Sequence, residues 1–151
     1  MVFTEVLNGP ALKYEVGVCI KTGYIVWVNG PFVGSENDGT VFSEGLGTLL
    51  AEDEAVEVDG EYKGNNKIKG PATAISQVQR KEKSVVRGWH ENVNGQLKLF
   101  NVLNACFRHC NPPEQMMRKH GLCFDSCSVI THLKFQGSKG LCNVKYNATY
   151  Y

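Results

Sequence analysis

Residues 14–29 read Tyr-Glu-Val-Gly-Val-Cys-Ile-Lys-Thr-Gly-Tyr-Ile-Val-Trp-Val-Asn, and this stretch decides the fold. Two runs rich in β-branched and aromatic residues, 14–20 and 24–29, are separated by a short segment that ends in Gly23. Such runs form strands, and a short loop that contains glycine joins them as a hairpin. Because proline cannot donate a hydrogen bond to a neighbouring strand, we expect the second strand to end at Gly30-Pro31.

Downstream segments predict helices and a third strand. Asp38 is placed to cap a helix over residues 40–50, and residues 55–58 are typical of a short strand that ends at Asp59. Residues 63–83 are basic, polar and weakly patterned, which indicates a flexible connector. After Pro112-Pro113 we expect a helix over residues 114–133 and then an extended tail over 141–146.

The strongest helical pattern lies between residues 86 and 107. Apolar residues recur there at spacings of three and four and form one stripe, composed of Val86, Trp89, Val93, Leu97, Phe100, Leu103 and Phe107. A separate polar face carries Arg87, Glu91, Asn94 and Lys98. Strands followed by long helices predict an α/β fold, a mixed sheet flanked by helices. Three predicted strands make a thin sheet, so we expect its first strand to be missing.

Composition restricts the class of protein. The 151 residues favour a single domain over residues 1–151, and 42% hydrophobic against 21% charged residues argues against disorder. No apolar window is long enough to span a membrane, and no signal peptide opens the sequence, so we expect neither a membrane nor a secreted protein. For the same reason the six cysteines are expected to be reduced thiols.

Charge is distributed unevenly along the chain. Residues 1–60 carry ten acidic side chains against two lysines, whereas residues 61–120 carry eleven Lys and Arg against four Glu. An acidic half can concentrate divalent cations and a basic half can follow phosphates, which suits an enzyme that acts on nucleic acid. The alternative is that these charges are simply solvated.

Two carboxylates are candidates for chemistry. Asp59 follows a predicted strand, and Glu91 lies on the polar face of the long helix, so two rigid elements could direct oxygen ligands at Mg²⁺ or Mn²⁺. The alternative is that Asp59 forms a turn and Glu91 pairs with Arg87.

Several motifs, taken in order, resemble the DDE superfamily endonucleases of eukaryotic transposons, the Harbinger-like transposases. The similar segments are residues 9–17, 21–32, 34–38 with Val41-Phe42, 57–64, 90–94, 107–109, 119–121 and 129–131. The segment His90-Glu91-Asn92-Val93-Asn94 resembles the helix that bears the family's final catalytic glutamate. The segment 57–64 resembles the one that bears its second catalytic aspartate, although Gly60-Glu61-Tyr62 replaces the usual Gly-Tyr order.

This resemblance implies a ribonuclease H-like fold in which two aspartates and one glutamate hold two divalent metals for cutting DNA. Asp59 takes the role of the second aspartate and Glu91 that of the glutamate. The first aspartate does not carry over, because Glu5 lies in a leader without a strand pattern and Glu15 lies within the hairpin. We therefore expect an N-terminally truncated, crippled domain with little nuclease activity, or an inactive module that binds DNA or a protein partner.

The resemblance also implies partners and a location. From the family we expect DNA and a separate DNA-binding subunit as partners, and the nucleus as the location. A missing strand would also favour self-association. DNA contacts are assigned to basic residues that precede and enter the long helix, namely Lys63, Lys67, Lys69, Arg80, Lys81, Lys83 and Arg87. The alternative for these is a solvated basic loop.

Cysteines and histidines gather in the C-terminal third, which allows a second metal hypothesis. The residues are Cys106, His109, Cys110, His120, Cys123, Cys127 and His132. Zinc accepts such ligands, but the spacings depart from the usual knuckle, and buried packing of ordinary thiols is the favoured interpretation.

Overall fold

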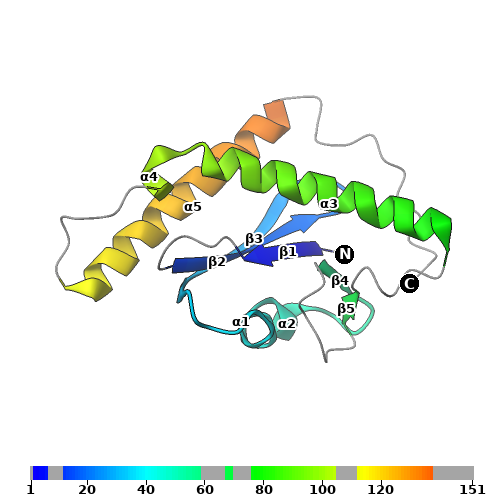
Figure 1. The fold of residues 1–151 in the computed structure, drawn as a ribbon, viewed down its shortest axis with the longest axis horizontal. Helices are drawn as coiled ribbons and strands as arrows, with labels where there is room; N and C mark the ends of the chain where they lie inside the picture. The colour runs from blue at the N-terminus through cyan, green and yellow to red at the C-terminus, as the bar shows by residue number, and fades with distance from the viewer. Residues whose placement is uncertain (1, 7–11, 59–66, 70–75, 105–111, 138–151) are drawn as a thin grey trace.

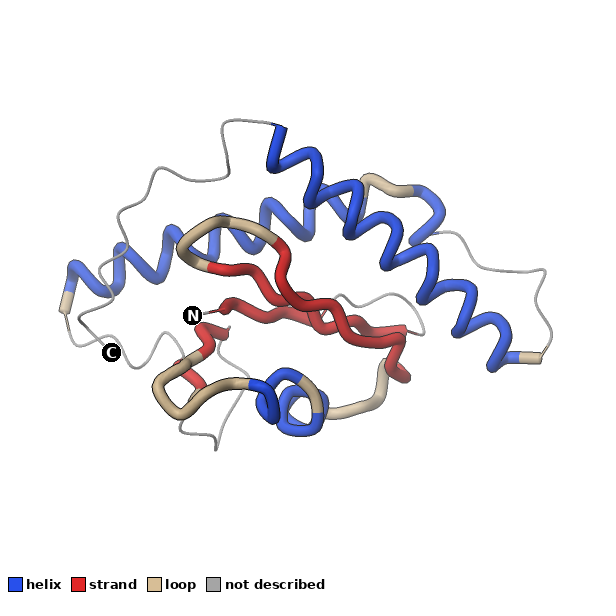
Figure 2. The backbone as a smooth tube through the Cα atoms, turned by 180° about the vertical axis from the view of Figure 1, so that it is seen from behind, coloured by secondary structure: helices blue, strands red, loops and turns tan. Residues whose placement is uncertain are grey.

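A five-stranded sheet lies between two layers of helices in the computed structural model, which describes residues 2–6, 12–58, 67–69, 76–104 and 112–137 (Figure 1). Seen from behind, the strands run between the two long helices on one side and a pair of short helices on the other (Figure 2). The strands are β1 (Val2–Val6), β2 (Leu12–Cys19), β3 (Ile25–Val33), β4 (Val56–Val58) and β5 (Ile68–Lys69). The helices are α1 (Asp38–Glu44), α2 (Leu46–Leu49), α3 (Gln77–Lys98), α4 (Asn101–Asn104) and α5 (Pro113–Gly137).

The sheet is mixed, as predicted, with the strand order β3-β2-β1-β4-β5. Strands β1, β2 and β3 are antiparallel neighbours, whereas β4 runs parallel to β1 and β5 runs parallel to β4. The expectation that no strand precedes the hairpin is wrong, because Val2–Val6 forms β1 at the centre of the sheet. Val2, Phe3, Thr4 and Val6 are β-branched or aromatic residues that favour a strand, and pairing with β2 and β4 satisfies the backbone of this short run.

The predicted hairpin is confirmed. Cys19 N–H donates to the Tyr24 carbonyl at 2.9 Å, and Gly23 has a positive φ of 71° that suits glycine in the turn. The second strand nevertheless continues past Gly30-Pro31 to Val33. β3 is an edge strand, and an irregularity in its pairing with β2 accommodates the proline, which edge strands and bulges tolerate.

Two short helices replace the single helix expected over residues 40–50. The side chain of Asn37, rather than Asp38, accepts a hydrogen bond from Gly39 N–H at 2.9 Å, so the helix begins one residue earlier than a cap at Asp38 would place it. Gly45 separates α1 from α2. The core on this side of the sheet contains Phe42, Leu46, Leu50, Val56 and Val58.

Helix α3 begins inside the segment that was expected to be a flexible connector. Its first residues are polar but are good helix formers, so the absence of an apolar stripe did not prevent a helix. Ile68–Lys69 in the same segment pairs with β4. Of the predicted apolar stripe, Val86, Trp89, Val93 and Leu97 are buried, as expected.

The long apolar stripe is divided between two helices. Phe100 and Leu103 lie after the end of α3 and pack partly buried against the core, while Phe107 lies outside the described residues. Asn94, which was placed on the polar face, is 4% exposed. Its Nδ2 lies 3.4 Å from Nδ1 of His90, which precedes it by one turn of α3, and both side chains are buried.

Helix α5 covers the same face of the sheet as α3 and extends four residues beyond the predicted end. Tyr14 of β2 stacks on Phe124 of α5, and its hydroxyl lies 2.6 Å from His120 Nδ1. The core between the long helices and the sheet contains Tyr14, Val16, Val18, Val93, Leu97, Phe124, Cys127 and Phe135. The predicted tail over 141–146 lies outside the described residues. In the parts of the chain that are described, no helix is long and apolar enough to cross a membrane.

Candidate nucleic-acid interface

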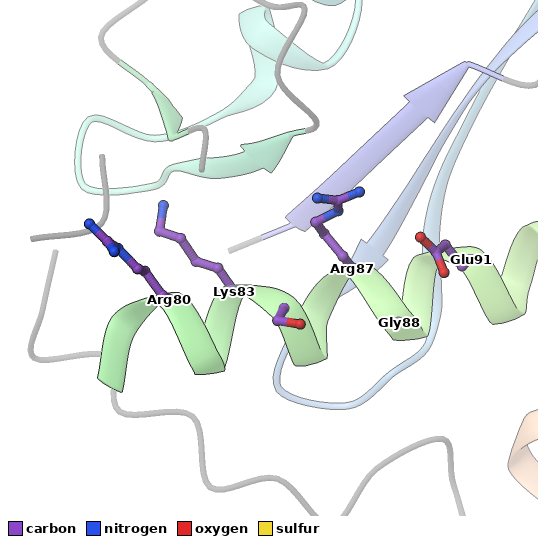
Figure 3. Close-up of a pocket in the computed structure, with 6 residues that line it drawn as sticks. Arg80, Lys83, Arg87, Gly88 and Glu91 are labelled. Atoms are coloured by element: carbon purple, nitrogen blue, oxygen red, sulfur yellow. The ribbon is translucent and has the colours of Figure 1, made fainter. Parts of the chain in front are cut away.

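A groove follows one face of α3. Its lining residues are Arg80, Lys83, Ser84, Arg87, Gly88 and Glu91, which are spaced three or four apart and therefore lie along one side of the helix. The cavity volume is about 630 Å³. The labelled basic side chains project toward the strands, and Glu91 lies farther along the helix (Figure 3). A Cβ added to Gly88 would meet nothing within 4 Å, so the groove floor is open at that turn.

The groove is predominantly cationic. Arg80 and Arg87 are exposed and carry permanent positive charges, and Glu91 is the one carboxylate among the described lining residues. Guanidinium groups match phosphate oxygens in a bidentate geometry. The arrangement is chemically suited to a linear polyanion that lies along the helix.

Lys83 differs from the two arginines of the groove. Its Nζ lies 2.8 Å from Glu57 Oε1, and the two side chains are 7% and 2% exposed. Glu57 is the middle residue of β4, whose flanking valines belong to the core on the other side of the sheet. The pair therefore joins α3 to β4 through the interior, and Lys83 presents little surface to a ligand.

The other predicted DNA contacts do not line this groove. Lys67 donates to the Leu50 carbonyl at 2.7 Å, Lys69 lies half-buried in β5, and Lys81 is exposed on α3 away from the lining set. Lys63 lies outside the described residues. The structure thus brings Arg80, Lys83 and Arg87 together with Glu91.

The acidic stretch before β4 and the basic groove of α3 lie on opposite sides of the sheet, although Lys67 of the basic half bonds to Leu50 at the end of α2. Acidic residues between positions 36 and 54 belong to the layer of α1, α2 and the loop before β4, while the basic groove lies on α3 across the sheet (Figure 1). A polyanion would be attracted to the α3 side and repelled from the α1–α2 side.

Of the predicted carboxylate pair, the structure describes Glu91 but not Asp59. Glu91 is exposed in the groove, whereas Asp59 lies outside the described residues, directly after the end of β4 at Val58. Divalent cations require several oxygen ligands. Within the described ranges, no group of three or more His, Cys, Asp or Glu residues is arranged to hold a metal ion. Glu91 and its cationic neighbours do not by themselves fit a metal centre.

The structure describes only some of the residues in the zinc hypothesis. Cys106, His109 and Cys110 lie outside the described residues. Cys123 and Cys127 are thiols on α5, and Cys127 is buried in the core, where burial raises the pKa of its thiol. His120 bonds to Tyr14, and burial lowers the pKa of its imidazole.

Two buried carboxylates were missed by sequence reasoning. Glu57 pairs with Lys83, and Glu15 of β2 accepts a hydrogen bond from Trp27 Nε1 at 2.6 Å. Both lie within runs of β-branched residues, and an acid inside such a run was the available signal, because a buried charge requires a partner.

Comparison of the chain with protein-family models, with curated proteins and with solved structures finds no match.

Proposed function

We propose that this chain is a DDE endonuclease-like domain of Harbinger-like transposase ancestry that holds the DNA backbone in the α3 groove. The observation that carries the proposal is the shared groove of Arg80, Lys83, Arg87 and Glu91. The motif that resembles the family's catalytic helix, His90 to Asn94, thereby lies beside the basic residues that were assigned to DNA.

The architecture supports a ribonuclease H-like fold as part of this proposal. A mixed sheet flanked by helices is what the resemblance implies. Strand β1 lies beside the parallel strand β4, after which Asp59 follows in the sequence. Carboxyl ends of neighbouring parallel strands meet at one edge of a sheet, where α/β proteins commonly place their ligands.

DNA contact in the groove would be independent of base sequence. The stretch from Arg80 to Glu91 advances about 16 Å along the helix axis, at about 1.5 Å per residue. The lining offers guanidinium groups from Arg80 and Arg87 and the hydroxyl of Ser84, which bond to phosphate oxygens and position a duplex without reading its bases.

A divalent metal, Mg²⁺ or Mn²⁺, is proposed at Asp59 and Glu91. When bound, such an ion activates a water and stabilises a leaving oxygen in phosphodiester chemistry. If β1 is the family's first strand, as we propose, its one acid is Glu5, whose backbone pairs with Val16 of β2, and the strand carries no aspartate. We propose that the site is crippled by the absence of that aspartate and that cleavage is weak or lost.

A plasmid-nicking assay in Mg²⁺ and in Mn²⁺ tests the catalytic part. The chain is expected to bind the plasmid and to nick it little or not at all. Robust cleavage that is abolished by Asp59→Ala would contradict the crippled site. The variants Glu5→Gln and Glu91→Gln then show whether Glu5 completes a carboxylate triad.

The second candidate function is an inactive nuclease-like module that binds DNA or a protein partner. It is favoured by the excess of cations over carboxylates among the described groove residues. A separate DNA-binding subunit and a nuclear location belong to both candidates as proposals. Self-association also stays a proposal, although the presence of β1 removes the missing strand from which it was expected. Nicking by the wild-type chain excludes the second candidate, and metal-independent DNA binding without nicking supports it.

A further inference from the structure

Lys83 joins the N-terminal part of α3 to the sheet through a buried ion pair. Between Gln77 and Val85, Lys83 is the only buried residue among those whose side chains the structure describes. Val78 is more than half exposed, and the apolar stripe of α3 begins only at Val86. Among the described side chains of this segment, Lys83 is therefore the buried contact closest to Arg80, and Val85 adds a partly buried contact with the cluster of Ile20, Val86 and Trp89.

Lys83 makes that contact through Glu57. The ammonium and carboxylate lie 2.8 Å apart, and both side chains are almost completely buried. Removing one partner of such a pair takes a counter-charge at 2.8 Å away from a buried ion, whereas replacing both with neutral groups of similar size removes that cost. The two residues should therefore behave as a unit in unfolding.

We infer that Lys83 is a positioning residue of the groove, which acts through Glu57 to hold α3 on β4 and does not itself contact phosphate. Arg80 and Arg87 are then the groove cations that contact DNA. This inference rests on the proposed function for its binding readout, and it proposes for Lys83 a role other than the DNA contact expected from the sequence.

The test uses four variants of the full chain: Lys83→Met, Glu57→Gln, the two combined, and Arg80→Met. Arg118→Met is the matched control, because Arg118 is an exposed cation on α5 outside the groove. Each variant is measured by urea unfolding and by binding to a duplex at several salt concentrations. The slope of log K against log salt is negative, and a lost phosphate contact reduces its magnitude, called the salt slope below, by about 0.9.

Lys83→Met is expected to lower the urea midpoint and the affinity while leaving the salt slope unchanged. Glu57→Gln removes no cation and should likewise lower the urea midpoint and the affinity. In the combined variant the urea midpoint should fall by less than the sum of the two single decreases. Arg80→Met should lower the slope by about 0.9 with little change in midpoint. Arg118→Met should change neither.

The inference is overturned if Lys83→Met lowers the salt slope as Arg80→Met does, or if the two single losses in midpoint are simply additive. Absence of DNA binding by the wild-type chain refutes the proposed function instead. In that case additivity of the unfolding midpoints alone decides whether Lys83 acts through Glu57.

Discussion

Glu15→Gln is expected to stabilise the protein at neutral pH. Glu15 is 0% exposed, and its Oε1 has no hydrogen-bond partner among the described residues. Burial raises the pKa of this carboxyl above its ordinary value, and hydrogen bonds from Trp27 and Asn29 offset only part of that rise. Glutamine has nearly the same shape, keeps an oxygen that can accept from Trp27, and carries no charge.

The direction of the pH dependence follows from the raised pKa. The folded chain binds the proton of Glu15 more tightly than the unfolded chain does. The resulting stabilisation is complete below the ordinary pKa of about 4.3, and it is lost as the pH rises through the raised pKa. The Glu15→Gln variant lacks this titration. It should therefore gain on the wild type as the pH increases and match it most closely in acid.

The magnitude comes from the negative charge on this buried carboxylate, because glutamine also places a polar atom where the unpartnered oxygen lies but carries no charge. A buried polar atom without a hydrogen bond costs about 1–3 kcal/mol, and more when it is charged. The free energy of unfolding of the variant minus that of the wild type is the quantity compared. We expect this difference to be about 1–3 kcal/mol larger at neutral pH than in acid. Urea unfolding followed by tryptophan fluorescence from about pH 4 to about pH 8 measures this. A difference that does not change with pH, or that moves in favour of the wild type as pH rises, would refute the reasoning.

Three further substitutions test the packing around the sheet. Phe42→Ala removes a fully buried ring from the core beneath the sheet and should cost about 3–5 kcal/mol in urea unfolding, whereas a loss below about 1 kcal/mol would mean that the ring is not enclosed. Gly45→Ala should destabilise the protein by about 1–3 kcal/mol in thermal melts, because the new Cβ would lie 2.6 Å from Asn29 Nδ2 and 2.9 Å from the Val41 carbonyl oxygen. Gly88→Ala is the matched control. A Cβ at that position meets nothing within 4 Å, so this variant should be neutral or stabilising. Tyr14→Phe removes the bond to His120 Nδ1 but keeps the stacking on Phe124, so calorimetry should show a loss of about 0.5–1.5 kcal/mol, and an unchanged melting temperature would argue against that bond.

Local patterns were sufficient where one period dominated the sequence. The hairpin around Gly23 and the buried stripe from Val86 to Leu97 followed from alternation and from spacings of three and four. Strand β1 carries the same signal, because Val2, Phe3, Thr4 and Val6 are β-branched or aromatic, but the run is only five residues long. Its central place in the sheet depends on pairing with β2 and β4, which the local pattern does not encode.

The groove was predicted in part for a similar reason. The residues Arg80, Arg87 and Glu91 lie on one helix, so their common face follows from helical spacing alone. The different role of Lys83 depends on Glu57, a residue 26 positions earlier on another element. No helical or strand period connects the two, and a lysine in a basic segment has the same sequence signature whether it faces solvent or a buried carboxylate.

The most direct test of the DNA-binding groove is duplex binding by fluorescence anisotropy between about 50 and 200 mM salt. Arg80→Ala/Arg87→Ala is compared with Arg118→Ala/Lys119→Ala, which removes the same charge from exposed positions on α5. The account predicts steep salt dependence for the wild type, a slope smaller by about 1.8 for the α3 variant, and an unchanged slope for the α5 variant. Binding that is insensitive to salt, or equal losses in the two variants, would contradict it.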